Sequence, residues 1–306
     1  MDSTLFNGIR SIFILKHLFA FLNEKSLLGI IKYNKKLQNK LTIGINNYTE
    51  FYNKIEIEVV INADNISENI KLISISKKDE PYYHIYFNYN EKEIKKNYIA
   101  KEDNISQVKI IIDPKIKSLN SLFQTCSHIN KISFIRFNRK DITDMSCMFD
   151  ECSSLKEINF TKFITNNVTN MNYMFNKCSS LKELNLNNFN TVNVREMNYM
   201  FYKCLSLTKL NLNSFNTTNV INMICMFDEC SSLKKLNLNS FITNKLTDTF
   251  HMFKGCSSLI ELYWNNLNFN NLSNIRGMFA KCSDDFKSQI KQKFNILKKE
   301  AFGEYY

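Results

Sequence analysis

The sequence predicts an α/β repeat protein, a solenoid of seven stacked 26-residue coils between two dissimilar ends. One observation is a ladder of cysteines, each 26 residues after the last: Cys126, Cys152, Cys178, Cys204, Cys230, Cys256 and Cys282. The other is a ladder of phenylalanines with the same step: Phe123, Phe149, Phe175, Phe201, Phe227, Phe253 and Phe279. Nothing interrupts this register, and self-similarity at a fixed period of about 20–29 residues is typical of a solenoid.

One repeat, residues 168–193, shows the predicted elements. Four apolar side chains follow the i, i+3, i+4, i+7 spacing of one helix face: Met171, Met174, Phe175 and Cys178. Leu184 and Leu186 then alternate with polar residues, as in a strand. We therefore expect one short helix and one strand in each coil. A single coil cannot bury its apolar face, so stacking would create the core.

The pattern M-x-x-M-F-x-x-C-S-S-L-K-x-L-N-L-N-x-F, from Met171 to Phe189, resembles the BspA-like, 26-residue type of leucine-rich repeat. The resemblance covers residues 117–282 and implies a leucine-rich-repeat solenoid. It leaves function open, because this repeat type occurs in secreted microbial surface proteins and in intracellular protist proteins.

The ends suggest further domains, at residues 1–45, 46–116 and 283–306. Residues 54–61, 82–89 and 108–112 are rich in β-branched and aromatic residues, which predicts strands in a small β-rich element that caps the first coil. Ser283 is a good helix N-cap, so we expect a C-terminal capping helix. Its apolar stripe would be Phe286, Ile290, Phe294 and Leu297.

Residues 9–41 predict an N-terminal helical hairpin, because apolar residues keep a helical spacing and Ser26 suits the start of a second helix. The succession I-L-x-x-L-F-x-x-L-x-x-x-S-L-L, then Y-N-K-x-L, resembles an F-box motif. The resemblance implies that the hairpin binds a ubiquitin-ligase adaptor through five residues: Leu15, Leu18, Phe19, Leu22 and Leu27. The alternative is a purely structural hairpin packed on the β-rich element.

The cysteine ladder predicts buried thiols that pack as small hydrophobic groups. Evenly spaced single thiols do not converge as zinc ligands do, and we expect no metal and no cofactor. Adjacent thiols are also expected to be too far apart for disulfides. Cys147 and Cys225 lie outside the ladder at a variable position, so we expect them to be free thiols at the surface, which favours a reducing compartment.

The outward positions of the predicted strands form the candidate partner-binding face. Its residues are Ile135, Glu157, Glu183, Lys209, Lys235, Glu261 and Tyr263. Aromatic side chains are enriched at binding hot spots, which favours the end of the face near Tyr263. By the same pattern Trp264 points inward, where Leu186 does in its own coil. The alternative for the middle of the face is a solvated surface.

Composition argues against catalysis. The net charge of +11 is spread without a block of like charges, so nucleic-acid binding is not expected. The four histidines are scattered, and no Gly-rich phosphate loop is present. With neither a signal peptide nor a transmembrane segment found, we expect a cytoplasmic protein. The expected function is a non-catalytic protein–protein interaction scaffold, in its sharper form an F-box-like substrate receptor. The alternatives are a secreted or cell-surface BspA-like adhesin and nucleic-acid binding through the basic repeat surface.

Overall fold

The computed structural model describes residues 34–41, 50, 52–62, 68–88, 90, 92–266, 268, 271–294 and 297–303. Its contacts divide the chain into two compact units, Met1–Lys54 and Ile55–Tyr306. In the first unit the structure describes one helix, α3 (Lys35–Leu41). Five residues of the F-box-like segment lie outside the described residues: Leu15, Leu18, Phe19, Leu22 and Leu27.

The second unit begins with the predicted β-rich element. Its strands are β1 (Ile55–Ile61), β2 (Ile70–Lys71), β3 (Tyr83–Phe87), β4 (Tyr98–Ile99) and β5 (Gln107–Ile112). The three longer strands confirm the strands predicted at 54–61, 82–89 and 108–112. Every second side chain of β1 is buried, starting at Ile55, because alternate side chains of a strand point to opposite faces. Short 3₁₀ turns precede β3 and β5, at Glu80–Tyr82 and Lys101–Asp103 respectively.

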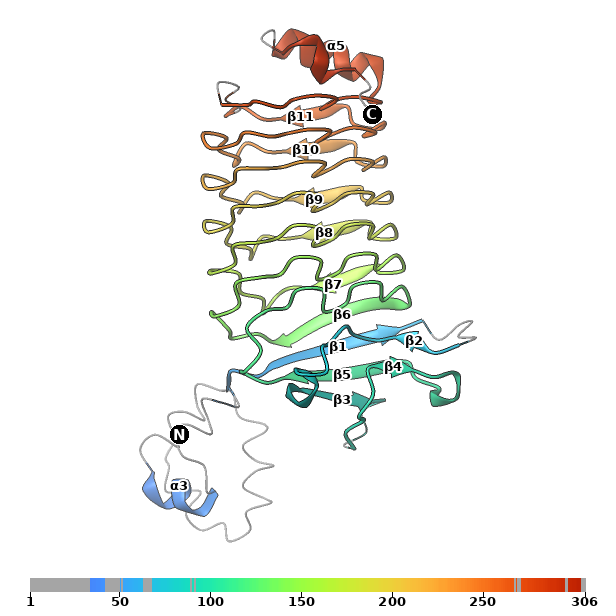
Figure 1. Ribbon diagram of the computed structural model, residues 1–306, viewed down its shortest axis with the longest axis vertical. Coiled ribbons are helices and arrows are strands. Elements are labelled where there is room, and N and C mark those ends of the chain that lie inside the picture. The colour runs from blue at the N-terminus through green and yellow to red at the C-terminus, as the bar shows by residue number, and fades with distance from the viewer. Residues whose placement is uncertain are drawn as a thin grey trace. The chain divides into compact units, whose positions relative to one another are not determined.

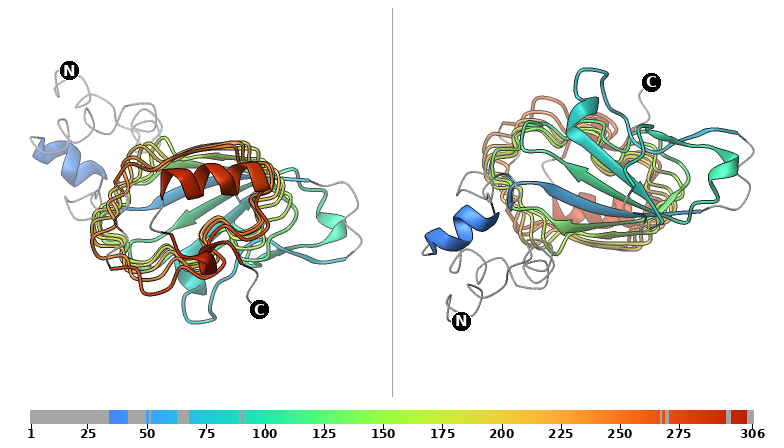
Figure 2. Two further views of the ribbon diagram at one scale, coloured as in Figure 1. Left: turned by 90° about the horizontal axis from the view of Figure 1, so that it is seen from above. Right: turned by 90° about the horizontal axis from the view of Figure 1, so that it is seen from below.

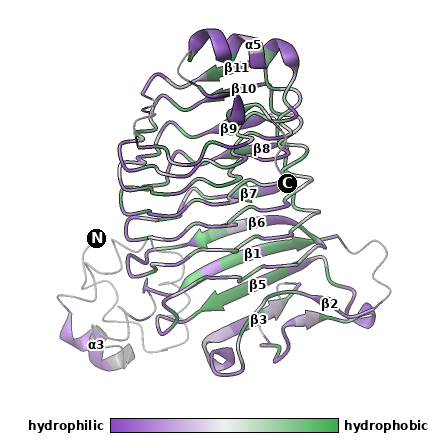
Figure 3. Ribbon diagram, turned by 45° about the horizontal axis from the view of Figure 1, so that its top comes forward, coloured by the Kyte–Doolittle hydropathy of each residue, from purple (hydrophilic) through white to green (hydrophobic). Residues whose placement is uncertain are grey.

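The β-rich element continues into the repeats through one sheet of five strands, in the order β3-β5-β1-β6-β7. Strand β1 is antiparallel to both β5 and β6 (Ile129–Arg136). Strand β6 is the strand of the first repeat, and it is parallel to β7 (Glu157–Asn159) of the second. Figure 3 shows that β1 and β5 are hydrophobic for most of their length, in contrast to the hydrophilic C-terminal helix.

Further repeat strands occur every 26 residues, namely β8 (Glu183–Asn185), β9 (Lys209–Asn211), β10 (Lys235–Asn237) and β11 (Glu261–Tyr263). Equivalent residues of successive repeats also form single parallel bridges, from Ser118 to Asp144 and on to Asn274. The repeats are therefore stacked in parallel and in register, and they lie over one another when viewed along the stack (Figures 1 and 2).

The predicted α/β solenoid, with one strand and one short helix in each of seven coils, is wrong. Among the described residues the α-helices are α3 and α5 (Asp284–Lys293), and neither lies in a repeat. The repeat strands form small separate sheets: β6 and β7 belong to the five-stranded sheet, while β8 pairs with β9 and β10 with β11. No single sheet runs through the described repeats.

The segment Met171–Cys178 shows why the predicted helix does not form. Tyr173 and Lys177 have left-handed backbones, with φ of 58° and 55°, which a right-handed helix cannot contain. The N–H groups of Tyr173, Phe175 and Lys177 donate to carbonyl oxygens of the next repeat at 2.7–2.9 Å, instead of to their own segment. The apolar spacing did identify the buried face, since all four predicted side chains are buried.

The core of the stack is the pair of ladders seen in the sequence. Each ladder phenylalanine from Phe123 to Phe279 stacks on its equivalent in the next repeat, with ring centroids 5.4–5.8 Å apart. Each ladder thiol donates to a carbonyl oxygen 29 residues earlier in all but the first repeat, as from Cys178 Sγ to Phe149 at 3.1 Å. The thiols are therefore both packing groups and hydrogen-bond donors. Trp264 is fully buried, as its place in the pattern predicts.

At the C-terminal end of the stack, α5 begins where the sequence places it. The Ser283 side chain accepts a hydrogen bond from the backbone N–H of Phe286, and the rings of Phe286 and Phe279 lie 6.1 Å apart. The helix has ten residues and ends at Lys293, so the predicted capping helix with a stripe through Phe294 and Leu297 is corrected to this shorter helix. A 3₁₀ turn follows at Lys299–Ala301. No helix in the described part of the chain is long and apolar enough to cross a bilayer.

Candidate interaction face

The outward side chains of the six repeat strands form the strand face, and its first column consists of three ion pairs. Lys131 pairs with Glu157 at 2.6 Å, Glu183 with Lys209 at 2.5 Å, and Lys235 with Glu261 at 2.6 Å. Parallel in-register strands place each partner directly opposite the other. These pairs are largely exposed to solvent, which screens the attraction between their charges, so none of them contributes much to stability.

The second column of the strand face is structural. The side-chain oxygens of Asn159, Asn185, Asn211 and Asn237 each accept the backbone N–H two residues later, at 2.9–3.1 Å. This is an Asx turn, in which a short polar side chain imitates a backbone turn. The recurring asparagines therefore shape the end of each strand.

The middle of the strand face contains an open hollow of about 650 Å³. Four of the predicted partner-binding residues line it: Glu157, Glu183, Lys209 and Lys235. The other three do not. Ile135 lies on β6 and Tyr263 on β11, at opposite ends of the series of repeat strands (Figure 1). They are 43% and 47% exposed, and the Tyr263 hydroxyl contacts Glu261.

A second hollow, of about 540 Å³, was not predicted from the sequence. It is lined by threonines, asparagines, one isoleucine and two cations: Thr143, Asn167, Thr169, Asn193, Arg195, Asn219, Ile221 and Lys245. Three of its asparagines, Asn167, Asn193 and Asn219, donate to carbonyl oxygens of the preceding repeat at 2.7–2.8 Å. The recurrence of asparagine at this position was the available signal. Its lining contains two cations, Arg195 and Lys245, and no carboxylate, so this hollow is basic.

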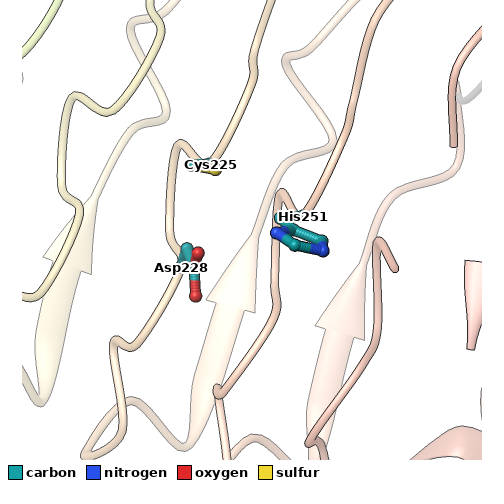
Figure 4. Close-up of side chains that lie close together, drawn as sticks. All are labelled: Cys225, Asp228 and His251. Carbon is teal, nitrogen blue, oxygen red and sulfur yellow. The ribbon is translucent and has the colours of Figure 1, made fainter. Parts of the chain in front are cut away.

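A buried polar cluster lies elsewhere in the repeats, formed by Cys225, Asp228 and His251 (Figure 4). One ligand atom from each residue lies within 4.8 Å of the other two. The side chains are 3%, 3% and 6% exposed, respectively. The prediction that Cys225 is a surface thiol is therefore wrong, whereas Cys147 is half-buried. The residue type at this position varies from repeat to repeat, and that variation suggested a surface position. The position is instead partly or fully buried, because its side chains lie between neighbouring repeats and pack on one another.

Burial also determines the electrostatics of the cysteines. It raises the pKa of Cys204, in the middle of the ladder, to about 12. Burial raises the pKa of Cys225 to about 12 as well, and the charge of Asp228 acts in the same direction. Thiolates are the reactive form, so neither site resembles an activated nucleophile. Burial raises the pKa of Asp228 to about 6, against the opposing effect of Lys254.

No curated protein matches the chain. Among solved structures, a leucine-rich repeat protein of T. pallidum matches with 19% identity and a TM-score of 0.30, over 57% of this chain and 74% of the other. That superposition is too loose to transfer any property. A family match covers residues 117–210 and 183–294, which together are more than half of the chain. The chain therefore belongs to the family described as Mycoplasma protein of unknown function, DUF285.

Proposed function

We propose that this protein is a non-catalytic scaffold that binds an acidic protein surface on its strand face. The supporting observation is the charge of that face. Six lysines lie on or beside the six strands: Lys131, Lys156, Lys182, Lys209, Lys234 and Lys235. Three glutamates, Glu157, Glu183 and Glu261, pair with three of these lysines. These six lysines and three glutamates leave a net charge of +3, and the remaining cation of the strands, Arg136 on β6, pairs with Glu56 of β1.

The distribution of these groups suits a partner larger than a small molecule. Lys156, Lys182 and Lys234 take no part in the three ion pairs and are exposed. The exposed side chains of Ile135 and Tyr263 lie at the two ends of the strand series, so one partner that covers the face would meet apolar contacts at both ends. Interfaces combine apolar contacts with charge complementarity, and the charges mainly determine specificity and association rate.

Charge reversal tests the proposal. We expect Lys182→Glu/Lys234→Glu to lose a partner that wild-type protein captures from its native cells after cross-linking, and we expect the capture to weaken as salt is raised. The matched control is Lys140→Glu/Lys281→Glu, which reverses two exposed lysines outside the repeat strands. Equal capture by both variants would contradict the proposal. Loss of the captured material on nuclease treatment would favour the nucleic-acid alternative.

A finer form of the proposal makes the protein a cytoplasmic substrate receptor whose residues 9–41 bind a ubiquitin-ligase adaptor. It rests on the F-box-like sequence pattern, and the family match, which begins at residue 117, lends it no support. Deleting residues 1–45 should then abolish recovery of an adaptor while capture on the strand face continues. If full-length protein recovers no adaptor, the ubiquitin-ligase role is excluded and the scaffold proposal is unaffected.

A further inference from the structure

The buried polar cluster combines residues from two successive repeats. Cys225 and Asp228 lie three residues apart in one turn, and His251 occupies the position of Cys225 in the next repeat. Both Cys225 and His251 have left-handed backbones, with φ of 51° and 54°, and this shared conformation places their side chains in the same column. We propose that Cys225, Asp228 and His251 form a zinc site that joins these two repeats.

The donor set fits zinc better than other common ions. A thiolate, an imidazole and a carboxylate are all zinc ligands, whereas calcium and magnesium favour oxygen ligands alone. At zinc–ligand distances of about 2.0–2.3 Å, tetrahedral ligand atoms lie roughly 3–4 Å apart. The three atoms within 4.8 Å therefore need only a small contraction. Water would fill the fourth position.

Charge balance favours the same ion. Zinc binds the thiolate, so the Cys225 thiol loses its proton to solvent when the ion enters. A divalent cation, one thiolate, one carboxylate and a neutral imidazole sum to zero. Buried charges are costly unless they are paired or coordinate a metal. A neutral zinc complex is therefore the form in which the thiolate and the carboxylate can remain buried and ionised beside the imidazole.

Two surrounding features favour a ligand here. Asp228 is 3% exposed, and its Oδ1 has no hydrogen-bond partner in the part of the chain that the structure describes. Gly277 occupies the position after His251 in the same column, and a Cβ there would meet His251 Cδ2 at 2.4 Å and Nε2 at 2.7 Å. Any other residue at 277 would displace the imidazole, so this glycine preserves the space in which it lies.

The chain contains a natural control for this site. Residues 147–156 and 225–234 are identical, CMFDECSSLK in both. In the first copy the position of His251 is occupied by Tyr173, and the carboxylate of Asp150 accepts hydrogen bonds from the amides of Gln124 and Asn176 at 2.8 and 2.5 Å. The first copy thus has the same thiol and carboxylate but no imidazole, and its carboxylate is already satisfied.

Titration of metal-free, full-length protein with Zn²⁺ against a competing chelator tests the site. We expect one zinc per chain and a higher melting temperature in its presence. Co²⁺ should give the visible absorption of a tetrahedral site together with thiolate charge transfer. Cys225→Ser, Asp228→Asn and His251→Gln should each lower the affinity by more than the roughly 10–100-fold that an outer-shell partner is worth. Cys147→Ser should bind as wild type does.

Three results would overturn the proposal: no stoichiometric binding of Zn²⁺ by the wild-type protein, unchanged affinity in a folded Cys225→Ser or His251→Gln variant, or equal loss in Cys147→Ser. The two conservative variants remove different ligands, so a folding failure of one leaves the other decisive. Circular dichroism of each variant without metal identifies such a failure.

Discussion

The two copies of CMFDECSSLK show how much of a repeat's chemistry comes from its neighbours. Cys147 and Cys225 have φ of 54° and 51°, and Glu151 and Glu229 have φ of 59° and 58°, so the two backbones match. Asp150 nevertheless lies between two amides that donate to it, whereas Asp228 lies beside a thiol and an imidazole. Identical segments fold identically here, and the residues 26 positions away in each direction decide what they can do.

The largest expected loss of stability comes from the ladder phenylalanines, and we expect it to be similar in both copies. Phe149→Ala and Phe227→Ala should each lower the free energy of unfolding by about 3–5 kcal/mol, because both rings are fully buried and stack on a ring on either side. Urea denaturation of the two variants measures this. A clearly larger loss in Phe149→Ala would mean that the additional ring contacts of Phe149, with Phe134 and Phe160, also contribute to stability.

The two aspartates should respond in opposite directions. Asp150→Asn replaces an oxygen that accepts from an amide with an NH₂ group, and it should destabilise the protein by about 1–3 kcal/mol. Asp228→Asn removes a buried carboxylate, and in the presence of chelator at pH 7 it should raise the melting temperature. Loss of stability in both variants would contradict the contrast. With excess zinc, Asp228→Asn should become the less stable protein.

The pH dependence of the stability of the metal-free protein should reveal the buried carboxyl of Asp228. The pKa of Asp228 is about 6 in the folded protein, because burial disfavours the carboxylate, and about 4 in an unfolded chain. The folded state therefore binds this proton more tightly, so its contribution to stability is present below about pH 4 and is lost as the pH rises through 6. Asp228→Asn should flatten the stability profile over this range, measured by denaturation at successive pH values. Cys147→Ser should leave that slope unchanged.

The ladder thiols of the two copies, Cys152 and Cys230, should lose similar amounts of stability on substitution. Cys152 donates to the carbonyl oxygen of Phe123 and Cys230 to that of Phe201, both at 3.0 Å. Each carbonyl also accepts a backbone N–H, from Cys126 and Cys204 respectively, so it keeps one partner when the thiol is removed. Cys152→Ala and Cys230→Ala should each cost about 1–2 kcal/mol in chemical denaturation. Losses as large as those of the phenylalanine variants would give the thiols a greater role than packing and one hydrogen bond.

The smallest expected effects concern two ion pairs, those of Glu151 and Glu229, which follow Asp150 and Asp228 in the sequence. Lys177 contacts Glu151 at 2.5 Å, whereas Lys203 lies 3.6 Å from Glu229. Both pairs are substantially exposed, so Lys177→Ala and Lys203→Ala should each change the free energy of unfolding by less than about 1 kcal/mol. Thermal melts at low and high salt would detect any difference. A larger, salt-independent loss in either variant would point to packing of the lysine stem.

The repeat period predicts which residues lie on the candidate strand face, but it does not predict which of the charged side chains there form ion pairs. The positions of Glu183 and Lys209 follow from the period alone, because a 26-residue step places them in the same column. Their pairing depends on the register and rotamers of two adjacent strands, which the period does not specify. The buried polar cluster was missed for a related reason: Cys225 was compared with its own column, whereas its contacts include Asp228 from another column of the same repeat.

The sequence by itself determined the repeat length, the number of ladder positions, the buried face of each repeat and the strands of the β-rich element. All of these follow from periodic burial of apolar side chains, which is local information. Tertiary structure alone decided the backbone of the buried face. The spacing of Met171, Met174, Phe175 and Cys178 is equally compatible with a helix and with a turn. Hydrogen bonding between repeats favoured the turn, because left-handed residues at Tyr173 and Lys177 direct the N–H groups toward the next repeat. An isolated segment has no such acceptors, so its sequence pattern could not reveal that outcome.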